Sequence, residues 1–288
     1  MAQRTIVIRT WVVVVFSIFL VCLIVFFCNL MNNRHVRLTK YRFASEDLPK
    51  EFDGFKVMVI SDYHNSRFYD QIGDYMKQTG PDLILLTGDL TELPDNKINN
   101  LEKLIERVPE NTQVMAVSGN HESESTRYDY IVHTLREWNV QVLENEATDI
   151  WRGDQHIKII GLKDPGNATR KIGESKIEEM KWFVNGCLYD DADCFSILAC
   201  HRANLYPHFK DLNTNLMLSG HLHGGIVRLP GLGGMVGENM ELHPDYTYGE
   251  YDEGHTKMIV SRGCDYNLLK MRVFNGPEVL LVTLRSER

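Results

Sequence analysis

Short apolar runs that end in polar clusters alternate with amphipathic stretches along most of this chain. Residues 55–60, 83–86 and 114–117 form the first three runs, which stop at Ser-Asp, Thr-Gly-Asp and Ser-Gly-Asn respectively. Aliphatic runs of this length that stop at turn-forming residues predict buried strands. Five later strands are predicted at 155–161, 195–200, 216–218, 258–261 and 279–284, and four helices at 68–77, 96–108, 127–138 and 175–183.

The order of these elements predicts the fold class. In the first half of the chain the strands are separated by helices, which is typical of βαβ units with parallel strands. The last strands are separated by loops, so the sheet is expected to be mixed there. The sequence has no internal repeat and no linker rich in Pro, Gly or Ser, and residues 55–288 are therefore expected to form one α/β domain.

The N-terminal segment has a different pattern, because no residue between Thr10 and Asn33 is charged. Eighteen of the twenty side chains in residues 11–30 are apolar, and twenty helical residues span roughly the 30 Å hydrocarbon core of a bilayer. A cleaved signal peptide has a shorter apolar run of about 7–15 residues, and a buried core helix is rarely so uniformly apolar. We therefore predict a transmembrane anchor at 11–30, after an N-terminal tail at 1–10 and before a basic juxtamembrane linker and entry segment at 31–54.

Charge is divided unevenly between the two parts of the chain. Six of the 31 Lys and Arg residues, and none of the 39 Asp and Glu residues, lie before residue 44, which leaves a net charge of −14 for the remainder. Such an acidic domain is not expected to bind nucleic acid through phosphate contacts. The positive-inside rule favours a cytoplasmic domain, but both flanks of the anchor are basic, so the side of the membrane stays open. The basic residues in 34–42 are interpreted either as a stop-transfer flank or as a contact with anionic headgroups.

Five of the polar clusters at strand ends carry residue types that bind metals. These candidate ligands are Asp62 with His64, then Asp89, Asn120 and His201, and finally His221 with His223. Because active residues in α/β sheets gather past the carboxyl ends of strands, we expect them to lie together. Seven oxygen and nitrogen ligands are too many for one catalytic ion and suit two divalent ions that share a bridging carboxylate. A set without thiolates suits Mn, Fe, Zn or Co, and residue type does not choose among them.

The order and spacing of these clusters resemble a known family. Residues 61–64 are SDYH, 88–90 are GDL, 119–122 are GNHE and 220–223 are GHLH, with a lone histidine in LACHR at 198–202. This series resembles the calcineurin-like metallophosphoesterase superfamily over about 55–285, and the tail is similar to a branch of small, often membrane-associated bacterial phosphoesterases. The resemblance implies a sandwich of two mixed sheets flanked by helices. It also implies a metal-dependent phosphoric ester hydrolase that uses a metal-bridging hydroxide as its nucleophile.

The resemblance implies a role for each motif position as well. Asp89 would bridge the two ions, and His121 would stay outside the ligand set as the catalytic proton donor to the leaving oxygen. Glu122 is a candidate supporting residue that would hold the loop. The other ligands would divide between the ions, with Asp62, His64 and His223 at the first and Asn120, His201 and His221 at the second.

Several residues near the motifs leave alternatives open. Tyr63 either narrows the mouth of the site or packs in the core, and Arg67 either contacts substrate phosphate or lies in a solvated loop. Cys200 is expected to pack rather than react. Cys187 and Cys194 are a candidate disulfide pair. The histidines that fit no motif position are expected to lie outside the site, and these are His35, His133, His156, His208, His243 and His255.

The leading interpretation is a membrane-anchored dinuclear-metal phosphoesterase that hydrolyses a phosphate ester or phosphoanhydride. Some members of the wider superfamily hydrolyse the pyrophosphate bond of UDP-diacylglucosamine, so a pyrophosphatase of lipid or envelope metabolism is the alternative. A non-catalytic scaffold of the same fold is a third interpretation, but such scaffolds typically lack a ligand or the catalytic histidine, and this chain has them all. The anchor favours a lipid-linked phosphorylated substrate, and no protein partner is expected.

Overall fold

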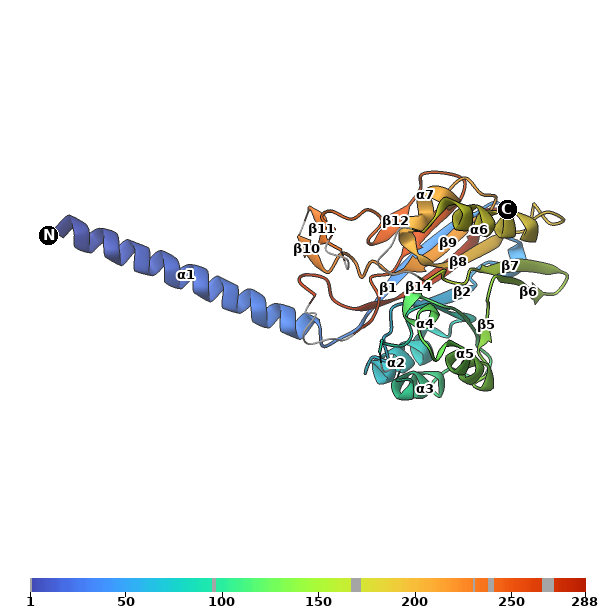
Figure 1. Ribbon diagram of the computed structural model, residues 1–288, viewed down its shortest axis with the longest axis horizontal. Coiled ribbons are helices and arrows are strands. Elements are labelled where there is room, and N and C mark those ends of the chain that lie inside the picture. Colours follow the sequence, from blue (N-terminus) through green and yellow to red (C-terminus); the bar gives the residue numbers. More distant parts are fainter. Residues whose placement is uncertain (1, 95–96, 167–171, 230, 238–240, 266–271) are drawn as a thin grey trace.

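The computed structural model describes residues 2–94, 97–166, 172–229, 231–237, 241–265 and 272–288. A single helix, α1 (Ala2–Asn32), projects from one end of a two-layered domain that holds the rest of the chain (Figure 1). Its segment Trp11–Asn32 has 22 residues and a mean hydropathy of 3.1, and the apolar stretch within it is not buried against the rest of the protein. One N-terminal helix is therefore long and apolar enough to cross a membrane, as the sequence predicts.

The first sheet has six strands in the order β1-β14-β2-β3-β4-β5. Strands β2 to β5 run parallel to one another, whereas β14 is antiparallel to β2 and parallel to β1, so the sheet is mixed. The bounds of its strands are β1 (Arg37–Ser45), β2 (Lys56–Ile60), β3 (Leu83–Thr87), β4 (Gln113–Val117), β5 (Gln141–Val142) and β14 (Glu278–Ser286).

The second sheet also has six strands, in the order β12-β13-β9-β8-β7-β6. Its four central strands are parallel and its two outer strands are antiparallel to their neighbours. The bounds are β6 (Glu146–Arg152), β7 (Gln155–Gly161), β8 (Ser196–Arg202), β9 (Leu216–Gly220), β12 (Gly249–Tyr251) and β13 (Lys257–Val260). A separate antiparallel hairpin consists of β10 (Val227–Leu229) and β11 (Gly233–Val236).

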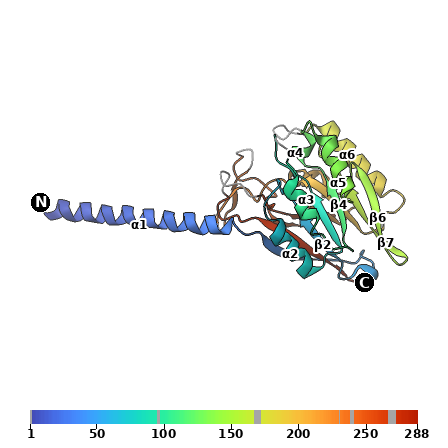
Figure 2. The ribbon, with the colours of Figure 1, turned by 90° about the horizontal axis from the view of Figure 1, so that it is seen from below.

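The main hydrophobic core lies between the two sheets. In β2, Val57 and Val59 point into this core, and Met58 and Ile60 point to the opposite face, which is the period-two alternation of a strand. Helices α2, α3 and α5 cover the outer face of the first sheet, and α6 and α7 cover that of the second (Figures 1 and 2). The helix bounds are α2 (Tyr69–Thr79), α3 (Asn99–Ile105), α4 (Asn120–Ser123), α5 (Tyr128–Glu137), α6 (Glu174–Cys187) and α7 (Tyr206–Phe209). The prediction of two mixed sheets flanked by helices is confirmed.

Most of the segment 31–54, which the sequence assigns to a basic juxtamembrane linker and entry segment, lies within the domain. Residues Arg37–Ser45 form β1, which pairs in parallel with all of β14, and Phe43 and Phe52 are buried in the main core. Because β1 is an edge strand, its basic side chains stay at the surface and interrupt the apolar alternation on which the prediction relied. Only residues 33–36 separate α1 from the sheet.

Candidate metal centre

All seven predicted ligands lie where strands of the two facing sheets end. The loops after β2 and β3 and the start of α4 carry four of them, and the end of β8 and the loop after β9 carry the other three. The side chains assemble into two adjoining groups that share Asp89. The first group is Asp62, His64, Asp89 and His223, and the second is Asp89, His201 and His221, with Asn120 beside His201.

The loops that present these side chains have an unusual backbone conformation. Five of the seven residues have a positive φ, namely Asp62 (48°), His64 (46°), Asp89 (51°), His221 (75°) and His223 (45°). Residues other than glycine adopt this region at a cost of about 1–3 kcal/mol each, and such residues cluster at functional sites. The loops also approach closely, because a Cβ at Gly220 would overlap Ser61 Oγ and Asp62 Oδ2. Packing therefore requires the glycine of the Gly-His-x-His motif.

The first group combines two carboxylates and two imidazoles. Nε2 of His64 lies 3.9 Å from Oδ2 of Asp89, and Nε2 of His223 lies 3.7 Å from Oδ1 of Asp62. The rings of His64 and His223 stack with their centroids 5.3 Å apart. Nε2 of His64 is buried and has no hydrogen-bond partner among the described residues. A buried imidazole nitrogen left open beside two carboxylates fits a metal ligand better than a structural histidine.

The second group surrounds the buried side chain of His201. Its Nδ1 donates a hydrogen bond to the carbonyl oxygen of Thr87 at 2.8 Å, which fixes the tautomer and leaves Nε2 facing the group. The distance from Nε2 is 3.2 Å to each of Asp89 Oδ2, Asn120 Oδ1 and His221 Nδ1. Atoms that ligate one ion at about 2.0–2.2 Å lie about 3–3.5 Å apart. The spacing of this group therefore fits a divalent ion.

The charges buried in the centre shift the pKa values of its side chains. Burial raises the pKa of Asp89, but the charge of His201 and its neighbours outweighs burial and lowers that pKa well below its usual value. Burial lowers the pKa of His64, but the hydrogen bond to Glu92 and the charge of Asp89 raise it to about 9. Asp89 likewise outweighs burial at His201 and raises its pKa to about 10. The centre therefore favours bound positive charge.

Glu122 ties the loops after β3 and β4 together behind the ligands. Its Oε2 accepts hydrogen bonds from the backbone N–H groups of Asp89 (2.8 Å) and Gly119 (2.9 Å). Its Oε1 accepts from the backbone N–H and the hydroxyl of Thr91, at 2.9 and 3.0 Å. Burial and the charge of Asp89 raise the pKa of Glu122, yet all four partners donate, so the side chain acts as a carboxylate. This position suits the loop-holding role expected for Glu122.

His121 lies at the rim of the first group. Its ring meets the ring of His64 edge-on with the centroids 4.6 Å apart, and its backbone N–H donates to Oδ1 of Asp89 at 2.9 Å. Nδ1 of His121 accepts a hydrogen bond from the backbone N–H of Leu93 at 3.2 Å. A neutral imidazole that accepts at Nδ1 carries its proton on Nε2. His121 is half-buried beside His64.

Three residues outside the motifs complete the surroundings of His64 and His223. Glu92 Oε2 lies 2.6 Å from His64 Nδ1. His223 Nδ1 lies 3.0 Å from Arg272 Nη2 and 3.3 Å from Asp265 Oδ1, and Arg272 and Asp265 form an ion pair. Sequence reasoning missed all three. Arg272 and Asp265 lie 49 and 42 residues from His223, so only the fold brings them to it. The one available signal was the closeness of Glu92 to the Gly-Asp motif.

The residues with open alternatives have clear positions in the fold. Tyr63 is fully buried and its hydroxyl donates to a backbone carbonyl at 3.1 Å, so it packs in the core. Cys200 is buried, as expected. Cys187 and Cys194 are free thiols rather than a disulfide. Arg67 lines a cavity at the base of α1 and belongs to neither ligand group.

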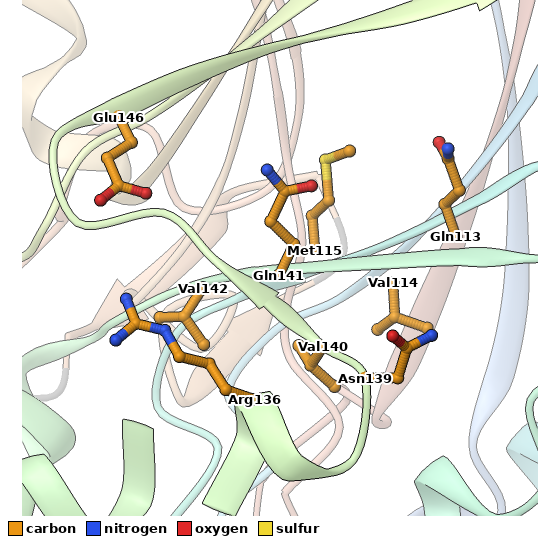
Figure 3. A pocket seen from close by; sticks show the side chains of 9 residues that line it. All are labelled: Gln113, Val114, Met115, Arg136, Asn139, Val140, Gln141, Val142 and Glu146. Carbon is orange, nitrogen blue, oxygen red and sulfur yellow. The ribbon is translucent and has the colours of Figure 1, made fainter. Parts of the chain in front are cut away.

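A cavity of about 390 Å³ opens in another part of the first sheet (Figure 3). It lies at the starts of β4 and β5, whereas the metal-ligand loop follows the end of β4. Arg136 and Glu146 contribute its charged side chains, as Figure 3 shows. None of the seven predicted ligands lines this cavity, so it is separate from the candidate metal centre.

Comparison with known proteins assigns the class of protein. The sequence profile of the calcineurin-like phosphoesterase family matches residues 55–225, and the chain belongs to this family. The family membership confirms the expected enzyme class, a metal-dependent phosphoric ester hydrolase. The grouped carboxylate and imidazole side chains are candidate metal ligands of the kind that this class uses.

Two bacterial relatives and one solved structure are similar to this chain. The uncharacterized metallophosphoesterase YkuE of Bacillus subtilis is 27% identical over 262 residues, which covers 87% of this chain and 86% of the relative. The phosphodiesterase YaeI of Escherichia coli is 28% identical over 242 residues, which covers 80% and 82%. The structure of the NAD nucleotidase NadN of Haemophilus influenzae is similar with a TM-score of 0.49 and 14% identity, over 74% of this chain and 45% of that chain.

Proposed function

We propose that this chain is a membrane-anchored phosphoesterase that binds two divalent metal ions and hydrolyses a phosphate ester or phosphoanhydride at the membrane surface. The observation that carries this proposal is the shared carboxylate of Asp89. Its Oδ2 lies 3.9 Å from Nε2 of His64 in one group and 3.2 Å from Nε2 of His201 in the other. A carboxylate shared between two adjoining sets of oxygen and nitrogen ligands suits two ions held side by side.

The side chains present divide the work between binding and proton transfer. Two such ions, when bound, would act as Lewis acids that activate a water molecule and offset the negative charge of the phosphoryl oxygens. His121 donates the proton on Nε2 to the leaving oxygen, while Nδ1 stays on the backbone N–H of Leu93. One ion would be held by Asp62, His64, Asp89 and His223, and the other by Asp89, Asn120, His201 and His221.

A short hydrogen-bonded path joins α1 to the metal centre. The side chain of Asn29 is buried, donates to the carbonyl of Arg272 at 2.6 Å and accepts from the N–H of Phe274 at 2.9 Å. Asn33 donates to the same carbonyl at 2.8 Å, and the guanidinium of Arg272 contacts His223. The domain is thus held against the end of α1 rather than on a flexible tether. This supports a metal centre that works close to the membrane surface.

Exposed apolar side chains lie beside this junction. The β10–β11 hairpin follows His223 in the sequence and lies at the same end of the domain as α1 (Figure 1). Backbone hydrogen bonds tie Ile226 and Arg228 to Val273, next to the residues that contact Asn29. An apolar surface beside a membrane helix suits contact with the bilayer, and supports an amphiphilic substrate. Its exposed side chains are Leu229, Leu232, Leu242 and Phe274.

The test of the proposed chemistry uses the full chain in lipid nanodiscs after loading with Mn²⁺. We expect elemental analysis to give two ions per chain. We also expect hydrolysis of at least one compound in a panel of phosphomonoesters, phosphodiesters, nucleotide pyrophosphates and phospholipids. A protein that holds two ions and hydrolyses none of them contradicts the proposal. One ion per chain with full activity contradicts the two-ion part of it.

The membrane part of the proposal is tested with Leu232→Ser and Leu242→Ser. Both variants should lower hydrolysis of a substrate embedded in the nanodisc several-fold and leave a soluble nitrophenyl ester unaffected. Trp182→Ser is the matched control, because Trp182 is 78% exposed on α6, away from α1 (Figure 1). If all three variants act alike on the embedded substrate, the hairpin does not contact the membrane.

A further inference from the structure

A cavity of about 570 Å³ lies where the end of α1 meets the start of α2. It is separate from the metal centre, because none of the predicted metal ligands lines it. Residues on both sides of the junction contribute to it, some from the last turn of α1 and some from the loop that leads into α2. The lining residues are Met31, Arg34, His35, Arg67, Phe68 and Gln71.

Hydrogen bonds from α2 hold the wall of this cavity in place. Gln71 Oε1 accepts from the backbone N–H of Val36 at 3.1 Å, and its amide nitrogen lies 3.5 Å from the carbonyl oxygen of Arg34. The hydroxyl of Tyr75 donates to the carbonyl of Val36 at 3.1 Å. Val36 itself is buried against the outer face of the first sheet. The short segment between α1 and β1 is therefore fixed on α2, and the cavity is preformed.

The charge of the cavity is opposite to that of the domain. Its lining includes Arg34, His35 and Arg67, all of them exposed, and no acidic residue, although the chain after residue 43 has a net charge of −14. Phe68 adds a buried apolar wall, and Met31 adds an exposed apolar side chain from α1. Two guanidinium groups beside apolar side chains suit a ligand with a phosphate and a hydrocarbon part.

The position of the cavity relative to the membrane indicates which phosphate-containing ligand it binds. The apolar segment Trp11–Asn32 has 22 residues, or about 33 Å of helix, which is the thickness of the hydrocarbon core. If α1 crosses a membrane, as the proposed function requires, residues directly after Asn32 lie at the level of the headgroups. We propose that this cavity binds the phosphate of an anionic membrane phospholipid, with Arg34 and Arg67 on the phosphate and Met31 and Phe68 on the glycerol and upper acyl chain.

The bound lipid is not the substrate in this proposal, because no metal ligand lines the cavity. Its phosphate would contact both arginines at the point where only residues 33–36 connect α1 to the sheet. The lipid would therefore join both sides of the junction, since Arg34 follows α1 and Arg67 precedes α2. An anionic lipid bound here would hold the domain in one orientation on the bilayer.

The experiment measures lipid retention by the full chain in neutral detergent with native mass spectrometry. Phosphatidylglycerol is compared with phosphatidylcholine of the same acyl chains and with inorganic phosphate. We expect the wild-type chain to retain one phosphatidylglycerol and little phosphatidylcholine. Arg34→Ala and Arg67→Ala should each weaken this binding about tenfold, the effect of losing one charge-assisted contact. The matched control is Arg127→Ala, because Arg127 is exposed but lies over Tyr130 beside α5.

Three results would overturn the proposal. Equal retention of the two lipids would show that the phosphate charge is not recognised, and equal behaviour of Arg34→Ala and Arg127→Ala would place the lipid elsewhere. Inorganic phosphate that binds as tightly, with the same dependence on Arg34, would make the cavity a free-phosphate site. These results are independent of the proposed function, whose failure would appear as a wild-type chain that retains lipid but hydrolyses no phosphoester. Arg34→Ala should not alter hydrolysis of a soluble ester.

Discussion

Replacing Glu122 with glutamine tests how the loops behind the metal centre are held. The carboxylate accepts four hydrogen bonds, two at each oxygen. If the glutamine oxygen points toward Asp89 and Gly119, the glutamine NH₂ group faces the buried backbone N–H of Thr91, which loses its acceptor. If the side chain is turned the other way, the backbone N–H groups of both Asp89 and Gly119 lose their acceptor. Each buried unsatisfied donor costs about 1–3 kcal/mol. With the first of these orientations, which loses only one hydrogen bond to a backbone N–H, Glu122→Gln lowers the free energy of unfolding by about 1–3 kcal/mol. This corresponds to a fall in melting temperature of about 2–12 °C for a domain of this size.

Thermal unfolding of the full chain in detergent, followed by tryptophan fluorescence, measures this loss. Glu124→Gln is the matched control, because Glu124 is exposed two residues later and the substitution changes the charge identically. An exposed substitution should alter stability by less than about 0.5 kcal/mol. If Glu122→Gln and Glu124→Gln have the same melting temperature, the four hydrogen bonds do not hold the loops and the reasoning is refuted.

Three other substitutions act on the centre itself. Asp89→Asn should leave fewer than two ions per chain by elemental analysis, because both groups share this carboxylate; retention of two ions would contradict the sharing. His121→Ala should keep both ions and lower kcat by about 10²–10⁴, with a smaller loss for nitrophenyl than for alkyl esters, and equal losses would exclude a proton donor. Gly220→Ala should lower the ion content, because its Cβ overlaps Ser61 and Asp62, and an unchanged content would show that the loops can move apart.

The parts of the fold that the sequence predicted are those whose burial is visible locally. Strands β2 and β3 are buried on both faces, so each appears as an aliphatic run that stops at turn residues. Strand β1 has no such run, because solvent faces one edge and its partner, β14, lies at the other end of the chain. Strand β6 is also mostly exposed. Strands of this kind are stable only through neighbours that the local sequence does not reveal.

The same limit separates the candidate ligands from the residues around them. A ligand that follows a strand end can be found from the sequence, because the strand and the polar cluster are adjacent. Arg272 reaches His223 from a distant segment, and only the fold brings the two together. Arg67 follows His64 by three residues, yet it lines the cavity at α1. The positive φ of His64 and Asn65 turns the chain between them, so closeness in sequence does not place Arg67 at the metal centre.

The short junction changes what the anchor contributes to catalysis. A linker of two dozen residues would let the domain rotate freely, and the anchor would then act only by raising the local concentration of substrate. With β1 in the sheet and Asn29 bonded to Arg272, the anchor also sets an orientation, which lowers the entropic cost of bringing an embedded phosphate to the metal centre. A Gly-Ser insertion of about ten residues after Asn33, combined with Asn29→Ala and Asn33→Ala to remove the bonds to Arg272 and Phe274, keeps the local concentration of substrate high and removes the fixed orientation of the domain. We expect this variant to lose several-fold in hydrolysis of an embedded substrate and nothing with a soluble ester in the same nanodiscs. If embedded and soluble substrates respond alike, proximity alone accounts for the anchor.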